Sequence, residues 1–177
     1  MDGTTQAMPN DASRPDDSTE SADAPGTWFD DATGLPGRAF WEAVLSAESA
    51  RCARFQRPAT IVLAQAIGFA DVVRLWGVDA AERSIADVGV KLRSGCRASD
   101  YVARLGDDRL GLILTETDEI AAINMVERVR AQCDRVMAAR AAGGRMAFGW
   151  ASATTSSSLL DAVARAEDRL ASDNGGD

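Results

Sequence analysis

The chain has 177 residues, of which 46% are hydrophobic, enough for one globular domain of ordinary size. Acidic residues outnumber basic ones by 27 to 19, and the formal charge of −8 argues against a general affinity for nucleic acid or an anionic membrane. The sequence contains no histidine, which excludes Ser-His and Cys-His nucleophile pairs and histidine-ligated zinc.

The first 26 residues are rich in Asp, Ser, Thr, Ala and Pro and show no apolar periodicity. Such a composition cannot offset the entropy lost on ordering, so residues 1–26 are expected to form a disordered acidic tail before a domain at 27–173. Asp2 and Asp11 stand where a secretory signal would carry positive charge, and no apolar run long enough to cross a membrane follows. We therefore expect a soluble, cytoplasmic protein.

The first half of the domain alternates helical and strand patterns. Apolar residues at helical spacing predict a helix from Arg38 to about Gln56, which Pro58 closes. The β-branched run at 59–67 is short enough for a buried strand. A short helix at about 69–76 and a longer one from Val78 to near Gly95 follow it.

The second half begins with a predicted hairpin, in which strands at 101–105 and 109–114 flank a tight turn. An amphipathic helix then begins near Asp118 and ends before Gly143, and 146–153 reads as a last core strand. Ser158 and Asp161 resemble a capping box that opens a final helix, expected to end near Leu170. The order α-β-α-α-β-β-α-β-α predicts an α/β fold.

The three cysteines, Cys52, Cys96 and Cys133, lie far apart within predicted helices, without metal-ligand spacing. We expect them to be small buried hydrophobic residues.

Several local motifs resemble one family. Residues 30–38, DDATGLPGR, are similar to the motif DxLTGLxNR, and residues 97–106, RASDYVARLG, are similar to RxxDxVARxG. Residues 146–151, MAFGWA, match a late strand usually written VSIGVA. These motifs, in this order, resemble those of GGDEF domains, the family of bacterial diguanylate cyclases. The turn at 106–110, GDDRL, then stands where the family has its GGDEF signature.

The resemblance implies a GGDEF or nucleotidyl-cyclase palm-like fold, with a central, mainly antiparallel sheet flanked by helices. It also implies a reaction in which two GTP molecules form cyclic di-GMP with the help of divalent metal. The family supplies metal-binding carboxylates at the positions of Gln65 and Arg109, and only the neighbouring Asp108 keeps its carboxylate. Its phosphate-binding lysine and guanine-binding asparagine correspond to Ala70 and Val73.

These replacements predict a degenerate domain that is not an enzyme and has no functional magnesium site. Arg109 invites two interpretations. Its guanidinium could pair with Asp107 or Asp108 and stand in for the missing metal, or it could be a solvent-facing charge on the hairpin.

A second site of the family, the product-inhibition site RxxD, matches Arg97 and Asp100, and a further arginine on the following helix matches Arg128. Arginine can donate two hydrogen bonds to guanine O6 and N7 or clamp a phosphate, and a carboxylate can accept from guanine N1 and N2. We expect cyclic di-GMP to bind these three residues. Alternatively, Arg97 caps a helix, Asp100 begins a strand and Arg128 is a solvated helix residue.

The resulting prediction is a catalytically inactive signalling receptor for cyclic di-GMP, with an unknown protein partner that could be a second copy of the chain. Two alternatives stay open: an interaction scaffold that binds no nucleotide, and a residual diguanylate cyclase.

Overall fold

The computed structural model describes residues 28–154 and 157–175. The predicted acidic tail at 1–26 lies outside the described residues. The elements follow the predicted order, and their bounds are α1 (Arg38–Phe55), β1 (Ala59–Ile67), α2 (Phe69–Trp76), α3 (Val78–Gly95), β2 (Tyr101–Arg104), β3 (Arg109–Thr115), α4 (Glu119–Ala138), β4 (Arg145–Ser152) and α5 (Leu159–Asn174).

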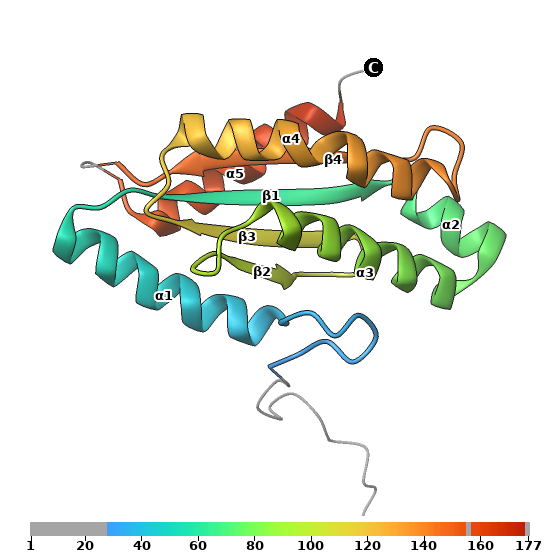
Figure 1. Ribbon diagram of the computed structural model, residues 1–177, viewed down its shortest axis with the longest axis horizontal. Coiled ribbons are helices and arrows are strands. Elements are labelled where there is room, and N and C mark those ends of the chain that lie inside the picture. Colours follow the sequence, from blue (N-terminus) through green and yellow to red (C-terminus); the bar gives the residue numbers. More distant parts are fainter. Residues whose placement is uncertain (1–27, 155–156, 176–177) are drawn as a thin grey trace, which may run out of the picture.

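The four strands form one antiparallel sheet in the order β2-β3-β1-β4. β1 lies in the middle, where Val62 is opposite Leu112 of β3 and Trp150 of β4. Its mainly apolar sequence is explained by this position, because both faces of a central strand are covered. Figure 1 shows α3 and α4 in front of the sheet and α5 behind it.

Side-chain alternation along the strands divides the core into two layers. Val62 and Ala64 of β1 pack with the inner faces of α2, α3 and α4, whereas Ile61 and Leu63 pack with α1 and α5. The predicted alternation in β3 is confirmed, since Leu110, Leu112 and Leu114 all belong to the first layer. The result is a helix–sheet–helix sandwich, which confirms the predicted fold class.

α5 approaches β4 closely because Gly149 has no side chain. A Cβ atom at Gly149 would lie 2.1 Å from the carbonyl oxygen of Ala166 and 2.4 Å from the amide nitrogen of Leu170, both backbone atoms of α5. The capping box predicted at Ser158 and Asp161 is present and begins this helix. α5 ends at Asn174 rather than near Leu170, and its last turn therefore reaches the end of β1.

β4 is an edge strand, and side chains bond its outward backbone groups. Asp134 and Asp173 accept hydrogen bonds from the amides of Met146 and Phe148, at 2.7 and 2.8 Å. Three arginines donate to outward carbonyls of the same strand: Arg130 to Met146 at 3.4 Å, Arg169 to Trp150 at 2.7 Å and Arg165 to Ser152 at 2.6 Å. Residues of α4 and α5 thus bond much of the edge that β1 leaves unpaired.

Cys52 and Cys133 are buried, as predicted, and Cys96 is partly buried. Within the described residues, no helix is long and apolar enough to cross a membrane.

Candidate functional site

The turn between β2 and β3 is held by a buried arginine. Arg104 is 8% exposed and donates to the carbonyl oxygens of Gly106 at 3.1 Å and Asp107 at 3.2 Å. It also donates to Asp30 Oδ1 at 2.8 Å, which ties the segment before α1 to the turn. Burial acts to raise the pKa of Asp30, but hydrogen bonds from Thr33 and Arg104 outweigh it and hold this pKa below its usual value.

Asp108 lies beside the end of β1, in a chain of side-chain hydrogen bonds. Gln65 donates through Nε2 to Asp108 Oδ2 at 2.8 Å and accepts through Oε1 from Asn174 Nδ2 at 2.8 Å. The Ala66 amide also donates to the Asp108 carbonyl at 2.9 Å. Two positions that the sequence places 43 residues apart therefore meet, and the last residue of α5 bonds to one of them, Gln65.

This chain of hydrogen bonds does not fit a divalent cation. Magnesium requires oxygen ligands, commonly carboxylates, whereas an amide nitrogen here donates to the one carboxylate available. In the described part of the chain, no group of three His, Cys, Asp or Glu side chains is placed to hold a metal. The absence of a functional magnesium site stays a prediction.

Arg109 does not pair with Asp107 or Asp108, and this hypothesis is wrong. Its guanidinium forms a two-pronged ion pair with Glu167 of α5, at 3.3 and 3.0 Å. The reason is strand geometry: Arg109 is in register with Gln65 on the sheet face that α5 covers, whereas the two aspartates belong to the turn. Both side chains are about two-fifths exposed, so the pair contributes at most about 1 kcal/mol to stability.

Arg97, Asp100 and Arg128 do come together. They line one pocket of about 320 Å³ between the turn after α3 and the first half of α4. The sequence separates Arg128 from the other two, and packing of α3 against α4 brings them to one place. The remaining lining residues are Gly95, Cys96, Leu114, Thr117, Ala121, Asn124 and Met125.

Asp100 is a structural residue as well as a pocket residue. Its side chain is buried, with Oδ2 accepting from the Arg97 amide at 2.7 Å and Oδ1 accepting from the Thr115 amide at 3.1 Å. The carboxylate therefore fixes the turn that carries Arg97 and joins it to the end of β3.

The two arginines differ in what they bond. Arg128 donates through one guanidinium nitrogen to the Gly95 carbonyl at 2.9 Å, and so caps the C-terminus of α3. The side chain of Arg97 is exposed and has no hydrogen bond or ion pair with the described residues. The helix-capping role suggested as an alternative for Arg97 thus belongs to Arg128.

The pocket also contains residues that the sequence motifs did not assign to a site, chiefly Asn124 and Cys96. Asn124 is four residues before Arg128 on α4, a spacing that places both on one helix face and could have revealed it. Burial raises the pKa of the Cys96 thiol to about 11, so this cysteine is protonated at neutral pH.

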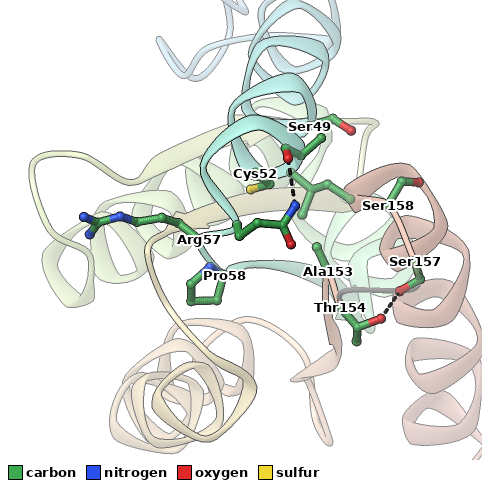
Figure 2. Close-up of a pocket in the computed structure, with 11 residues that line it drawn as sticks. Ser49, Cys52, Arg57, Pro58, Ala153, Thr154, Ser157 and Ser158 are labelled. Carbon is green, nitrogen blue, oxygen red and sulfur yellow. Dashed lines mark hydrogen bonds between the residues drawn. The ribbon is translucent and has the colours of Figure 1, made fainter.

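A larger hollow of about 500 Å³ lies at the other end of β1, between the C-terminus of α1 and the N-terminus of α5. Figure 2 shows small polar side chains in its lining, Ser49 among them, and the hydrogen bond between the Thr154 and Ser157 hydroxyls, which is 2.8 Å long. Cys52 also lines this hollow, and burial raises the pKa of its thiol. None of the predicted site residues lines it.

The family described as "Diguanylate cyclase, GGDEF domain" matches residues 27–173. Probable diguanylate cyclase DgcC of Escherichia coli K12 is 31% identical over 100 residues, which are 56% of this chain and 27% of that protein. Diguanylate cyclase DosC of the same strain is 26% identical over 116 residues, 66% of this chain and 25% of its own length. The aligned region thus covers about a quarter of these curated relatives.

Solved structures share the fold. Diguanylate cyclase SiaD of Pseudomonas aeruginosa, solved in complex with its activator SiaC, aligns with a TM-score of 0.75 and 25% identity over 85% of this chain and 59% of SiaD. The GGDEF domain of DgcB from Caulobacter crescentus, solved with cyclic di-GMP, gives a TM-score of 0.75 at 18% identity, over 89% of this chain and 95% of that one.

The curated relatives contradict one expectation. The replaced residues predicted that the chain is not an enzyme, but the matching relatives are named diguanylate cyclases, which points to enzyme activity, and the prediction is wrong. Although the individual side chains have changed, the turn and Asp108 lie beside the end of β1, held by Gln65 and Ala66.

Proposed function

Because the chain belongs to the GGDEF domain family, we propose that it binds cyclic di-GMP in the pocket formed by Arg97, Asp100 and Arg128. The observation that carries this proposal is the convergence of two arginines on one pocket in an acidic chain. With a formal charge of −8, the molecule as a whole does not attract an anion, so a local pair of cations has to do so.

The chemistry of the pocket suits a guanine dinucleotide. The Arg97 guanidinium, which no described residue engages, is free to donate to guanine O6 and N7 or to a phosphate. Arg128 has its fork oriented by the Gly95 carbonyl and keeps further N–H groups for a ligand. A volume of about 320 Å³ is at the lower end for ligand pockets, so it suits one half of the dinucleotide.

The DgcB domain, whose fold this chain shares, was solved in complex with cyclic di-GMP, which makes this dinucleotide the first ligand to test. We place the binding in the cytoplasm, and we propose that the bound state is passed on to a protein partner or to a second copy of the chain. SiaD offers a precedent for a protein partner, since it was solved with its activator.

Calorimetric titration with cyclic di-GMP tests the proposal. Arg97→Ala should weaken binding by about 1.5–3 kcal/mol, the range for a hydrogen bond to a charged group, or roughly ten- to more than a hundredfold in Kd. Arg135→Ala is the matched control, because Arg135 is an exposed arginine of α4 that does not line the pocket. Absence of binding by the wild-type chain, or equal binding by Arg97→Ala, would refute the proposal.

Diguanylate cyclase activity on GTP is the second candidate function, favoured by the names of the curated relatives. Incubation with GTP and magnesium or manganese, followed by chromatographic detection of cyclic di-GMP, tests it. Product should form in proportion to protein and should be lost in Asp108→Ala, since Asp108 is the carboxylate of the turn. A chain that neither binds the dinucleotide nor makes it would be an interaction scaffold.

A further inference from the structure

Much of the negative charge of the chain precedes Trp28, the first residue that the structure describes. Residues 1–27 contain six acidic residues and one basic residue, so they hold more than half of the net charge of −8. Four of these acids fall within residues 16–23, which we call the acidic segment: Asp16, Asp17, Glu20 and Asp23. They lie only 5 to 12 residues before Trp28, so the place of Trp28 on the domain decides what the segment can reach.

Trp28 is anchored beside a row of aromatic rings that leads toward Arg97. Its carbonyl oxygen accepts from the Gly37 amide at 2.9 Å. Its ring lies 5.7 Å from the Phe40 ring, which in turn lies 6.0 Å from the Tyr101 ring. Tyr101 and Arg97 line one hollow of about 380 Å³, which we call the Tyr101 hollow. Because 5 and 12 residues span at most about 18 and 43 Å, the acidic segment is long enough to reach it.

Arg97 is the cation of this hollow that no described residue engages. Both carboxylates of the lining pair with Arg51, Glu48 at 2.8 Å and Glu116 at 3.2 Å, and Glu116 also pairs with Arg57 at 3.2 Å. The exposed Arg97 guanidinium, in contrast, has no hydrogen bond or ion pair with the described residues. Its planar fork of N–H groups suits a side-chain carboxylate as well as a phosphate. An acidic peptide and an anionic ligand would therefore compete for the same group.

We propose that the acidic segment docks on the Tyr101 hollow and competes with cyclic di-GMP for the Arg97 guanidinium. The competition rests on the proposed function, whereas the docking itself does not. Besides the guanidinium, the hydroxyls of Ser99 and Tyr101 offer donors to a carboxylate. Exposed ion pairs are weak, but a tethered segment acts at an effective concentration on the order of millimolar. The segment thus lowers the affinity for the dinucleotide without abolishing binding.

Carbodiimide crosslinking of the full chain tests the docking without nucleotide. Arg97→Lys keeps the positive charge and provides an amine, which the reagent joins to a carboxylate in contact with it. Peptide mass spectrometry should then find links from position 97 to the acidic segment. Arg135→Lys is the matched control, because Arg135 is exposed on α4 and lines neither the pocket nor the hollow. Equal yields of segment links in the two variants, or links from position 97 to acids of the domain alone, would overturn the proposal.

Calorimetric titration with cyclic di-GMP measures the competition. Neutralising the segment with Asp16→Asn, Asp17→Asn, Glu20→Gln and Asp23→Asn should tighten binding by about two- to fivefold at low salt. The difference should disappear at about 1 M salt, where the screening length falls to about 3 Å. The control variant neutralises four exposed acids of α2, α3 and α5 that line neither the pocket nor the hollow, and it should leave Kd nearly unchanged: Asp71→Asn, Asp79→Asn, Asp87→Asn and Asp168→Asn.

The outcomes separate this proposal from the proposed function. Equal tightening in the two neutralised variants would mean that net charge sets the affinity, and an unchanged Kd in the segment variant would mean that the segment does not compete. Either result refutes the competition. If wild type and variants all fail to bind cyclic di-GMP, the proposed function is wrong, and the crosslinks from position 97 alone decide whether the segment docks.

Discussion

The carboxylate of Asp100 both bonds two backbone amides and lines the pocket. It accepts from the amides of Arg97 and Thr115, and the pocket it lines depends on the backbone that it fixes. If the carboxylate were removed, the buried amide of Thr115 and the partly buried amide of Arg97 would both lose the acceptor that they now share. A loss of ligand binding on mutation of Asp100 therefore cannot be read as loss of a ligand contact alone.

Asp100→Ala should lower the free energy of unfolding by about 2–4 kcal/mol, because the buried amide of Thr115 and the partly buried amide of Arg97 lose their acceptor. Urea denaturation followed by circular dichroism measures this change. Asp107→Ala, in the exposed turn, should change stability by less than about 0.5 kcal/mol. Equal stability of the two variants would show that Asp100 does not hold the turn.

Substitutions near the end of β1 can test whether added carboxylates create a magnesium site. Gln65→Asp combined with Arg109→Glu would place two additional carboxylates beside Asp108 and remove the cation that now pairs with Glu167. Magnesium should then raise the melting temperature of the double variant more than that of the wild-type chain, since oxygen ligands replace an amide and a guanidinium. Differential scanning calorimetry with and without magnesium decides this. A response as large in the wild-type chain would mean that Gln65 and Arg109 do not block a metal.

Between elements, the Asp30–Arg104 pair joins the segment before α1 to the hairpin turn. The pKa of Asp30 is lowered in the folded state, so its charged form stabilises the fold. This contribution is present above the unfolded pKa of about 3.9 and is lost as the pH falls through the lower, folded value. Asp30→Asn should therefore destabilise the chain at pH 7 and flatten the acid limb of its stability curve below about pH 4. Urea midpoints of the wild-type chain and of Asp30→Asn, measured from pH 2 to 7, test this. A parallel loss of stability in the two chains would contradict it.

Local patterns predicted the elements well because apolar residues recur at the spacing of a helix or a strand in most of them, as in Leu110, Leu112 and Leu114 on one face of β3. The end of α5 was missed because no large apolar residue follows Leu170, and Asn174 is ordered by a contact to Gln65, 109 residues away. Glu167 as the partner of Arg109 is equally non-local. Arg97, Asp100 and Arg128 were found through a family motif, whereas the polar, solvent-facing Asn124 belongs to no motif.

At the scale of the whole molecule, the sheet has two edges of different construction. β2 is only four residues long, and its last amide, that of Arg104, donates to the Pro36 carbonyl of the segment before α1. β4 is twice as long and is bonded along its outward side by five charged side chains of α4 and α5. Several arginines and aspartates thus bond the backbone groups of one strand.

The bonded edge of β4 governs how copies of this chain behave when crowded together. An open strand is a template on which a neighbouring chain can add a strand of its own and begin a fibril. Arg169→Ala with Asp173→Ala would free a carbonyl and an amide on this strand at no net change of charge, and should produce thioflavin-binding aggregates at concentrations where the wild-type chain scatters no light. Arg135→Ala with Asp168→Ala changes two exposed side chains in the same way away from the edge and should stay dispersed. If both double variants remain equally dispersed, other parts of the molecule keep the chains apart.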